Sequence, residues 1–456
     1  MADNQDLSIE SPGAYYPQDF SLKTLNFLTA SGQRIEIKKL LVEFSYYEDI
    51  YSFVTSGYIT LVDAQGFIEL MRLTGNEFIE VNFGKVKSGR NETDQRFRIY
   101  KSSARKPSGN MNSEVYTLFF CSEELLLSEQ TKVRKSFKGN KISKIVNNIL
   151  SDKLKVSSKR IDKIEETTGM YDFVIPNLKP FEAISWVSTY ARPANYPGAD
   201  MLFFETKNGF NFRSIQSMFK DDIYATYKYE AKNIDDKTQS FQEKTISILD
   251  YEITKPFDAL NEISSGTLAN RLISLDPLTR TAKTTDFDYN KFKLQAKSLN
   301  SAGVQDTLQN RLGQKSNESY DGVFKLAFSN AGQQTNSYIK QQGGTAKDIF
   351  IETYVPNRTA QISLANYTTI KTTIPGDPGI TAGRTINFNL LSLKPGSERE
   401  LDKFYSGKYL VTAVRHIIQT QGIYQTVLEI VKDSSATTYP SINNNSSEWK
   451  TAVKES

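Results

Sequence analysis

The residues of this chain that could do chemistry are mainly carboxylates. Adjacent acidic pairs occur at four places: Glu123-Glu124, Glu165-Glu166, Asp221-Asp222 and Asp235-Asp236. Two carboxylates can supply the acid and the base of a glycosidase. Adjacent residues, however, do not share a helix face, and they point to opposite faces of a strand. The pairs therefore form no local dyad, and the sequence predicts no enzyme, although a dyad built from distant carboxylates stays open.

Histidine and cysteine are each present once, as His416 and Cys121. This scarcity excludes His-rich and Cys-rich metal sites and disulfide scaffolds, and leaves one candidate for histidine-based proton transfer. The phosphate-binding and nucleophile motifs GxGxxG, GxxxxGK[ST] and GxSxG are absent. We therefore expect no catalytic residue, metal or cofactor. His416 is interpreted as a structural or interface side chain, and Cys121 as a small buried one.

Positive charge is concentrated between residues 132 and 163, where eleven Lys and Arg residues accompany two Asp residues. The whole chain has 56 basic and 52 acidic residues, a balance that is not typical of a general nucleic-acid binder. The basic segment is interpreted either as a solvated face or as a surface for an acidic partner. Trp449, alone in a polar tail, suggests docking onto a partner or a neighbouring subunit. The candidate partner-binding residues are Lys132, Arg134, Lys135, Lys138, Lys141, Lys144 and Trp449.

Most of the chain has the pattern of β-strands. Short apolar or alternating runs, separated by turn residues, cover residues 34–120 and predict a small antiparallel barrel. Further strands are predicted at 201–206, 210–215, 368–374, 385–390, 407–416 and 424–432. The polar N-terminus resembles no secretory signal, and no apolar run approaches the length that spans a bilayer. We therefore expect a protein made in the cytoplasm without membrane insertion.

Helical periodicity appears in the middle of the chain. Apolar residues at 142, 145, 146, 149 and 150 form one stripe of an amphipathic helix. A second helix is predicted to begin at Pro180 and to end at Arg192-Pro193. A short helix is expected at 358–367. Residues 281–349 are poor in apolar side chains and indicate an extended or partly mobile insertion, and the last 23 residues have the composition of a tail.

The chain contains a faint internal repeat. In the first copy, Gly75 precedes alternating apolar residues at 79–83, a strand with Phe97 and Ile99, and a third strand at 117–119. In the second copy, Gly383 precedes 386–390, 409–411 and 426–428 with similar spacing. Any two antiparallel meanders look alike, so pattern alone leaves chance similarity open. The alternative is two copies of one barrel in a single chain.

Three segments carry a resemblance to a known family. They are FVIPNLKPFEAISW at 173–186, GDPGITAGRTINF at 376–388, and SGKYLVTAVRH at 406–416 closed by TVLEIVKD at 426–433. Together they resemble the baseplate hub proteins of contractile-tailed bacteriophages, and the order of modules agrees over most of residues 20–435. The insertion and the tail contribute little to this resemblance.

The resemblance implies a fold and a function. It implies a mainly β fold with an α/β middle and two tube-type antiparallel β-barrels per chain. It implies a homotrimeric ring in which six barrels accept a sixfold tail tube, while the opposite face holds a threefold central spike. The implied partners are the tube protein, the spike protein and baseplate wedge proteins, in the tail baseplate of the virion. No sequence-specific nucleic acid is expected, and the basic segment is predicted not to line the DNA channel, because phosphate-gripping walls would hold the DNA.

These expectations divide the chain as follows: 1–125 first barrel; 126–200 helical or α/β module; 201–256 and 350–433 second barrel; 257–349 insertion; 434–456 tail. Two other functions stay open. One is the hub part of a related injection apparatus, such as a tailocin or a type VI secretion spike. The other is a glycan-binding or hydrolytic tail protein.

Overall fold

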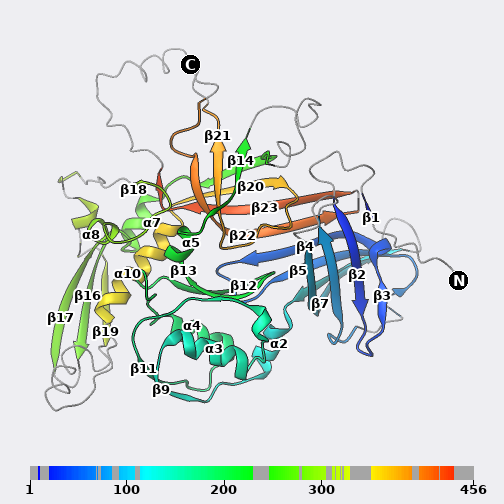
Figure 1. Cartoon of the computed structure of the whole chain (residues 1–456), viewed down its shortest axis with the longest axis horizontal. Coiled ribbons are helices and arrows are strands. Elements are labelled where there is room, and N and C mark those ends of the chain that lie inside the picture. The colour runs from blue at the N-terminus through cyan, green and yellow to red at the C-terminus, as the bar shows by residue number, and fades with distance from the viewer. Residues whose placement is uncertain are drawn as a thin grey trace.

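The computed structural model describes residues 9–10, 20–67, 69, 73–84, 92–107, 113–229, 246–276, 280–303, 311–313, 315–318, 320, 323–328, 351–392, 400–420 and 422–435. A 14-stranded sheet links two groups of strands, and smaller sheets and a few helices lie beside it (Figure 1). The predicted mainly β fold with an α/β middle is therefore confirmed.

The N-terminal six-strand set follows the order β2-β6-β7-β8-β5-β4 in the sheet, and all of its pairs are antiparallel. Alternate residues of all six strands, among them Phe27, Phe44 and Phe97, are buried in one core. The short β1 and β3 pair with β2. The elements are β1 (Ile9–Glu10), β2 (Ser21–Leu28), β3 (Arg34–Glu36), η1 (Lys38–Leu40), β4 (Leu41–Asp49), β5 (Ser56–Asp63), β6 (Phe78–Gly84), β7 (Thr93–Pro107) and β8 (Glu114–Cys121).

The C-terminal six-strand set follows the order β14-β21-β22-β23-β20-β15. If the strands of each set are numbered along the chain, both sets have the sheet order 1-4-5-6-3-2. They differ in one pair, because β14 runs parallel to β21, whereas β2 runs antiparallel to β6. The strands are β14 (Ile223–Tyr229), β15 (Asp250–Lys255), β20 (Thr368–Pro375), β21 (Thr385–Leu390), β22 (Gly407–Gln419) and β23 (Ile423–Lys432).

The two sets also agree in detail at their fifth strands. The backbone N–H of Ile99 donates to Glu77 at 3.0 Å, and that of Val411 donates to Arg384 at 2.8 Å, where each strand leaves its fourth neighbour. Directly after these residues, both strands carry a register shift against the sixth strand. A shared strand order and a shared irregularity are what the predicted repeat requires.

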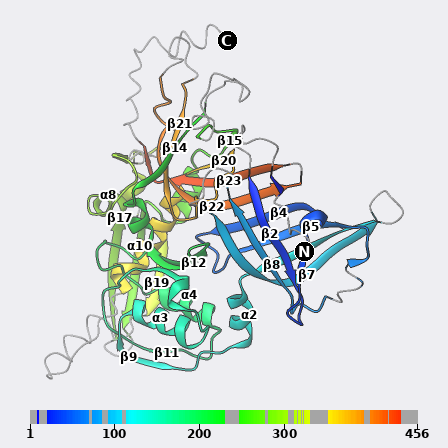
Figure 2. The same cartoon turned by 45° about the vertical axis from the view of Figure 1, so that its right-hand side comes forward.

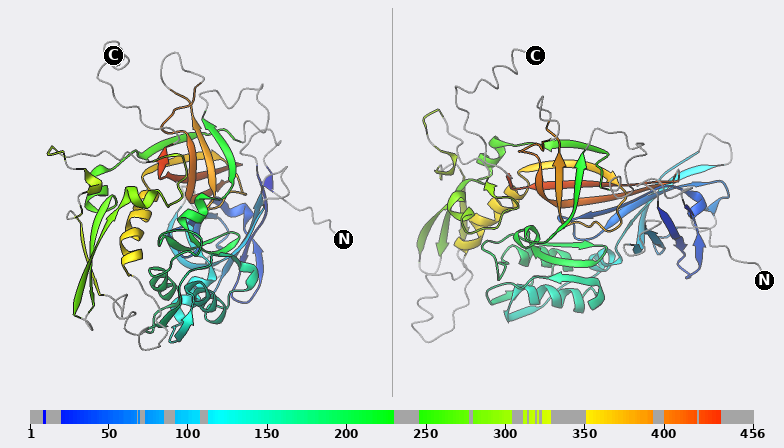
Figure 3. Two further views of the ribbon diagram at one scale, coloured as in Figure 1. Left: turned by 60° about the vertical axis from the view of Figure 1, so that its left-hand side comes forward. Right: turned by 45° about the horizontal axis from the view of Figure 1, so that its top comes forward.

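The two sets are joined edge to edge. The second half of β22 pairs antiparallel with β4, from Ala413 opposite Asp49 to Gln419 opposite Glu43. Ile418 and Tyr424, at the far end of the β22–β23 hairpin, are buried in the core of the N-terminal set. The long orange and red strands that reach the blue strands in Figures 1 and 3 show this connection. The sheet therefore runs without interruption from one set into the other.

A compact α/β module lies below the two sets in Figures 1 and 2. Helices α3 and α4 pack against the sheet β10-β13-β12, and the apolar stripe predicted for α3 is buried. Helix α4 begins at Pro180 as predicted but ends at Ser188, earlier than the sequence suggested. The elements are α2 (Glu123–Gln130), β9 (Ser136–Asn140), α3 (Ile142–Asp152), η2 (Ser158–Arg160), β10 (Ile161–Ile164), β11 (Tyr171–Val174), α4 (Pro180–Ser188), β12 (Met201–Thr206), β13 (Gly209–Ser214) and α5 (Ile215–Phe219).

The β12–β13 hairpin has a different place from the one we expected. The sequence grouped it with the second barrel, whereas its backbone pairs with β10 of the module. Both of its faces are apolar: Phe203 and Phe212 lie in the core of the module, and Phe204 lies in the core of the C-terminal set. The hairpin therefore lies between the core of the module and the core of the C-terminal set and contributes side chains to both.

The insertion contains regular structure in its described part. Strand β16 pairs antiparallel with β17 and parallel with β19, and β18 pairs with β24. Helix α10 begins at Ile351 and includes Pro356, so the predicted start at 358 was wrong, because burial of Ile351 and Tyr354 against Tyr190 extends the helix. The elements are α7 (Ala259–Ser264), β16 (Ala269–Asp276), β17 (Thr281–Asp288), α8 (Tyr289–Lys293), β18 (Ala302–Gly303), η3 (Ser316–Glu318), β19 (Phe324–Phe328), α10 (Ile351–Ala365) and β24 (Ser434–Ser435).

Candidate assembly surfaces

A buried carboxylate joins the three bodies of the chain, which are the N-terminal set, the C-terminal set and the α/β module. Glu48 on β4 is 1% exposed and accepts hydrogen bonds from the Tyr46 hydroxyl at 3.0 Å, the Lys207 backbone N–H at 2.7 Å and the Ala382 backbone N–H at 3.0 Å. These donors belong to the N-terminal set, the module and the C-terminal set, respectively. Burial raises the pKa of Glu48, and the three donors oppose that shift. Such a fully satisfied carboxylate fixes the relative placement of the bodies.

A second buried cluster joins the N-terminal set to the module. Arg160 forms ion pairs with Glu124 and Glu205, which come from α2 and β12. Glu205 also accepts from the Thr55 backbone N–H at 3.0 Å and from the Ser122 hydroxyl. Burial raises the pKa of Glu205 to about 7, and Arg160 acts in the opposite direction. Removing Arg160 would leave the two buried carboxylates without their cationic partner.

His416 lies inside the N-terminal core, where β22 passes β4. Its Nδ1 shares hydrogen bonds with the Tyr424 hydroxyl at 2.9 Å and the Thr426 hydroxyl at 3.3 Å, and its ring stacks on Tyr46 with a centroid distance of 5.9 Å. Its Nε2 is buried without a hydrogen-bond partner in the described structure. Burial lowers the pKa of His416 to about 3, so the imidazole stays neutral at neutral pH. The structure thus agrees with the structural role predicted for His416.

Cys121 and Trp186 also have packing roles. Cys121 is buried at the end of β8, and burial raises the pKa of its thiol to about 12, which suppresses the reactive thiolate. Trp186 on α4 packs edge-on against Phe173 with a centroid distance of 5.4 Å. Trp449 lies outside the described residues.

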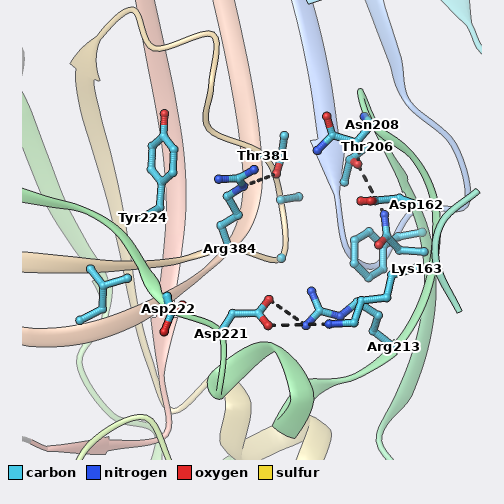
Figure 4. A pocket seen from close by; sticks show the side chains of 15 residues that line it. Asp162, Lys163, Thr206, Asn208, Arg213, Asp221, Asp222, Tyr224, Thr381 and Arg384 are labelled. Atoms are coloured by element: carbon cyan, nitrogen blue, oxygen red, sulfur yellow. Dashed lines mark hydrogen bonds and ion pairs between the residues drawn. The ribbon is translucent and has the colours of Figure 1, made fainter. Parts of the chain in front are cut away.

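A polar pocket of about 410 Å³ opens between β10, β13, the start of β14 and the loop before β21 (Figure 4). Its charged groups are largely engaged with one another. Arg213 lies 2.7 Å from Asp221, Lys163 lies 3.9 Å from the same carboxylate, and the guanidinium of Arg384 lies 4.9 Å from the ring centroid of Tyr224. The pocket places no histidine or cysteine beside these groups. We interpret it as a polar joint between the module and the C-terminal set.

The six lysines and arginines predicted to bind a partner lie together around β9 and the start of α3, at the lower rim of the molecule in Figure 1. Three of them are engaged within the chain: Arg134 donates to Asn177 at 2.6 Å, Lys135 lies 3.0 Å from Asp152, and Lys141 pairs with Glu166. The other three, all exposed, have no carboxylate within 4 Å in the described structure: Lys132, Lys138 and Lys144. Their role in partner binding stays a prediction.

The two buried joints around Glu48 and Glu205 were not predicted from the sequence. Glu48 and Glu205 each stand in a strand beside aromatic residues, and a carboxylate at such a position is unusual unless it is paired. A carboxylate among aromatic strand residues could therefore have indicated a buried, paired group. Its partners could not be identified from the sequence, because they come from distant segments of the chain.

A metal-binding cluster and a membrane-spanning helix are both absent from the part of the chain that the structure describes. No three His, Cys, Asp or Glu side chains in this part of the chain gather closely enough to hold a metal ion. None of the helices that the structure describes has the length and apolar character needed to cross a membrane.

The overall architecture is shared with solved tail proteins. The chain superposes on the 43 kDa tail protein of prophage MuSo2 from Shewanella oneidensis with a TM-score of 0.53 and 8% identity, over 90% of this chain and 99% of that one. It superposes on the tail protein of Neisseria meningitidis MC58 with a TM-score of 0.51 and 11% identity, over 90% and 96%. No family model matches the chain. The fold is therefore that of tail proteins.

Among tail proteins, sequence similarity relates this chain to a baseplate hub protein. The chain is 25% identical over 413 residues to the probable baseplate hub protein gp334 of Vibrio phage KVP40, covering 88% of this chain and 91% of that protein. The resemblance to phage baseplate hub proteins is thereby confirmed. These comparisons support a structural role in a phage tail baseplate.

Proposed function

We propose that this chain is one subunit of a homotrimeric baseplate hub that adapts a sixfold tail tube to a threefold central spike. The carrying observation is the repeated strand order, because two equivalent six-strand sets per chain give six in a trimer. A ring forms only when the rotation between neighbours closes. Three copies related by a threefold axis satisfy this condition and offer six similar six-strand sets to a hexameric partner.

The proposed division of labour follows the three bodies. The two six-strand sets build the wall of the ring around a channel for DNA ejection. The module, which carries Lys132, Lys138 and Lys144 on its rim, faces an acidic surface of a wedge or spike protein. The buried joints around Glu48 and Glu205 keep the sets and the module in register. The insertion and the tail, including Trp449, are left for partner contacts, and the hub is assembled in the host cytoplasm before it joins the virion.

The proposed role is not enzymatic. The similar proteins are named as tail or baseplate proteins. Burial causes the shifted pKa values of Glu205 and His416, which lie in a joint and in a packed core, so these shifts have a structural cause. We expect no turnover of cell-wall glycans and no sequence-specific binding of nucleic acid.

The test is the mass of the assembled chain. Native mass spectrometry should give a species of three times 51.6 kDa, and electron microscopy with the cognate tube protein should show the trimer at the end of the tube. A chain that stays monomeric at every concentration and with every tail partner would contradict the proposal. For the basic rim, Lys138→Glu should reduce capture of the wedge or spike protein while leaving the trimer intact.

A further inference from the structure

The 14-stranded sheet has an unpaired edge along β15 and another along the second half of β7, in the part of the chain that the structure describes. Strand β15 ends the path of the 14-stranded sheet, with β20 on one side and no described strand on the other. Strand β7 pairs with β6 only up to Arg98, and its second half, to Pro107, pairs with β8 alone. Unpaired strand edges are templates for pairing with another chain.

The chain itself shows how equivalent edges are paired. Strand β4 is the second strand of its set, and it pairs antiparallel with the second half of β22, the fifth strand of the other set. The second strand of the C-terminal set is β15, and the fifth strand of the N-terminal set is β7. The two unpaired edges are therefore the counterparts of the two edges that are already joined within the chain.

We propose that β15 of one subunit pairs antiparallel with the second half of β7 of the next subunit, reproducing between chains the β4–β22 contact within the chain. This inference rests on the proposed trimer and identifies the backbone contact that would close it. The occupant of each edge is a second copy of this chain. Every subunit then contributes eight consecutive strands, from β7 to β15 along the sheet path, to one closed wall.

The register follows from the strand pairs of the two sets. Ile99 and Val411 occupy the same position before the shared register shift, so that Ser103 corresponds to Arg415, which lies opposite Tyr47 on β4. Tyr47 lies opposite Ser56 of β5, and Lys255 lies opposite Thr369 of β20. Ser56 and Thr369 occupy equivalent positions in the third strands of the two sets, so Tyr47 corresponds to Lys255. The contact thus begins with Ser103 opposite Lys255.

Beyond the pair Ser103–Lys255, β7 carries one residue more than its counterpart β22, and β15 carries one residue more than its counterpart β4. These residues lie at the register shift between Ser103 and Lys106 in β7 and between Ile253 and Lys255 in β15. The two extra residues compensate each other, so that Lys106 falls opposite Glu252.

The charges at this contact are complementary. Lys106 and Glu252 are exposed, and neither has an ion pair in the described structure. Both point away from the cores, because Lys106 lies opposite Val115 and Glu252 alternates with the half-buried Tyr251 and Ile253. The internal contact has the same polarity, since Arg415 of β22 lies 3.2 Å from Glu43 of β4. Opposite charges facing each other across strands stabilise a pair, and like charges destabilise it.

Charge reversal in the full chain tests the contact. Lys106→Glu and Glu252→Lys should each weaken trimer formation roughly tenfold or more, because like charges would face each other at all three interfaces. The double variant should restore the trimer. Lys144→Glu, an exposed change of the same charge on α3, is the matched control and should leave the mass distribution in native mass spectrometry unchanged.

A disulfide tests the register independently of charge. The pair Lys106→Cys with Glu252→Cys should give a covalent trimer after oxidation, because directly opposite residues bring their Cβ atoms close. The pair Lys144→Cys with Glu252→Cys should not. A wild-type trimer that tolerates both single reversals and forms no crosslink would overturn this pairing and leave the proposed hub intact. A wild-type chain that neither trimerises nor crosslinks would overturn both.

Discussion

Acid should weaken this fold through its one histidine. The pKa of His416 is about 3 in the folded chain, against 6.5 for the free side chain, because the imidazole is buried. The groups around it are the ring of Tyr46, the hydroxyls of Tyr424 and Thr426 and, farther away, the ammonium of Lys207, which also disfavours a positive charge. The unfolded chain therefore binds a proton below pH 6.5 that the folded chain refuses until about pH 3.

The size of the effect follows from this difference. At pH 5 the unfolded histidine is protonated and the folded one is neutral, so the free energy of unfolding falls by about 2 kcal/mol relative to pH 7, at 1.4 kcal/mol per pH unit. The stabilising contribution is complete above pH 6.5 and is lost progressively as the pH falls toward 3. The double variant His416→Phe/Tyr424→Phe removes the titrating group and its nearest hydroxyl partner, and the Thr426 hydroxyl keeps the backbone N–H of Asp377 as a hydrogen-bond donor.

Urea unfolding at pH 7 and pH 5 measures this contribution. The loss on acidification should be about 2 kcal/mol smaller in the double variant than in Tyr424→Phe, which keeps the histidine and serves as the control. The imidazole NMR signal is unique because the chain has one histidine. A folded-state titration of that signal near pH 6.5, or equal acid losses in the two variants, would refute the burial argument.

Three further outcomes are expected. Glu48→Gln replaces one of the two accepting carboxylate oxygens by an NH2 donor, so that the backbone N–H of Lys207 or of Ala382 loses its acceptor, and it should cost about 1–3 kcal/mol in thermal unfolding; exposed Glu123→Gln should cost nothing measurable, and equal melting temperatures would contradict the joint. The pKa of Glu205 is raised to about 7, so its stabilising contribution is complete below pH 4.5 and lost by about pH 7; Glu205→Gln should abolish that decline, and an unchanged pH profile would argue against it. Gly57→Ala would place a Cβ 2.2 Å from the carbonyl oxygen of Ser45; circular dichroism should show loss of the N-terminal set, and a native-like spectrum would contradict this.

Local pattern predicted the elements whose burial is one-sided. Ile145 and Ile149 on α3 repeat at helical spacing, and Pro180 marks a helix start that local chemistry alone explains. The fourth to sixth strands of each set were visible for the same reason, because alternating residues face one core. These signals identify which face of an element is buried, and they do not identify its partner.

Partners from distant segments decided the features that were missed. Arg415 and Ser45 are 370 positions apart, yet they adjoin where β22 meets β4. Helix α10 contains Pro356 because tertiary burial of Tyr354 outweighs the local cost of a proline within a helix. Glu48 could not be recognised as a joint, because two of its three donors are backbone N–H groups of the distant residues Lys207 and Ala382.

The seam between β4 and β22 has a mechanical consequence. Its seven residue pairs lie side by side along the strands. A force directed along those strands would load the rungs in parallel, so that they must fail together, whereas a force at right angles would open them one after another. The β4–β22 pairing thus joins the two six-strand sets into one sheet, which transmits a force directed along these strands from one set to the other.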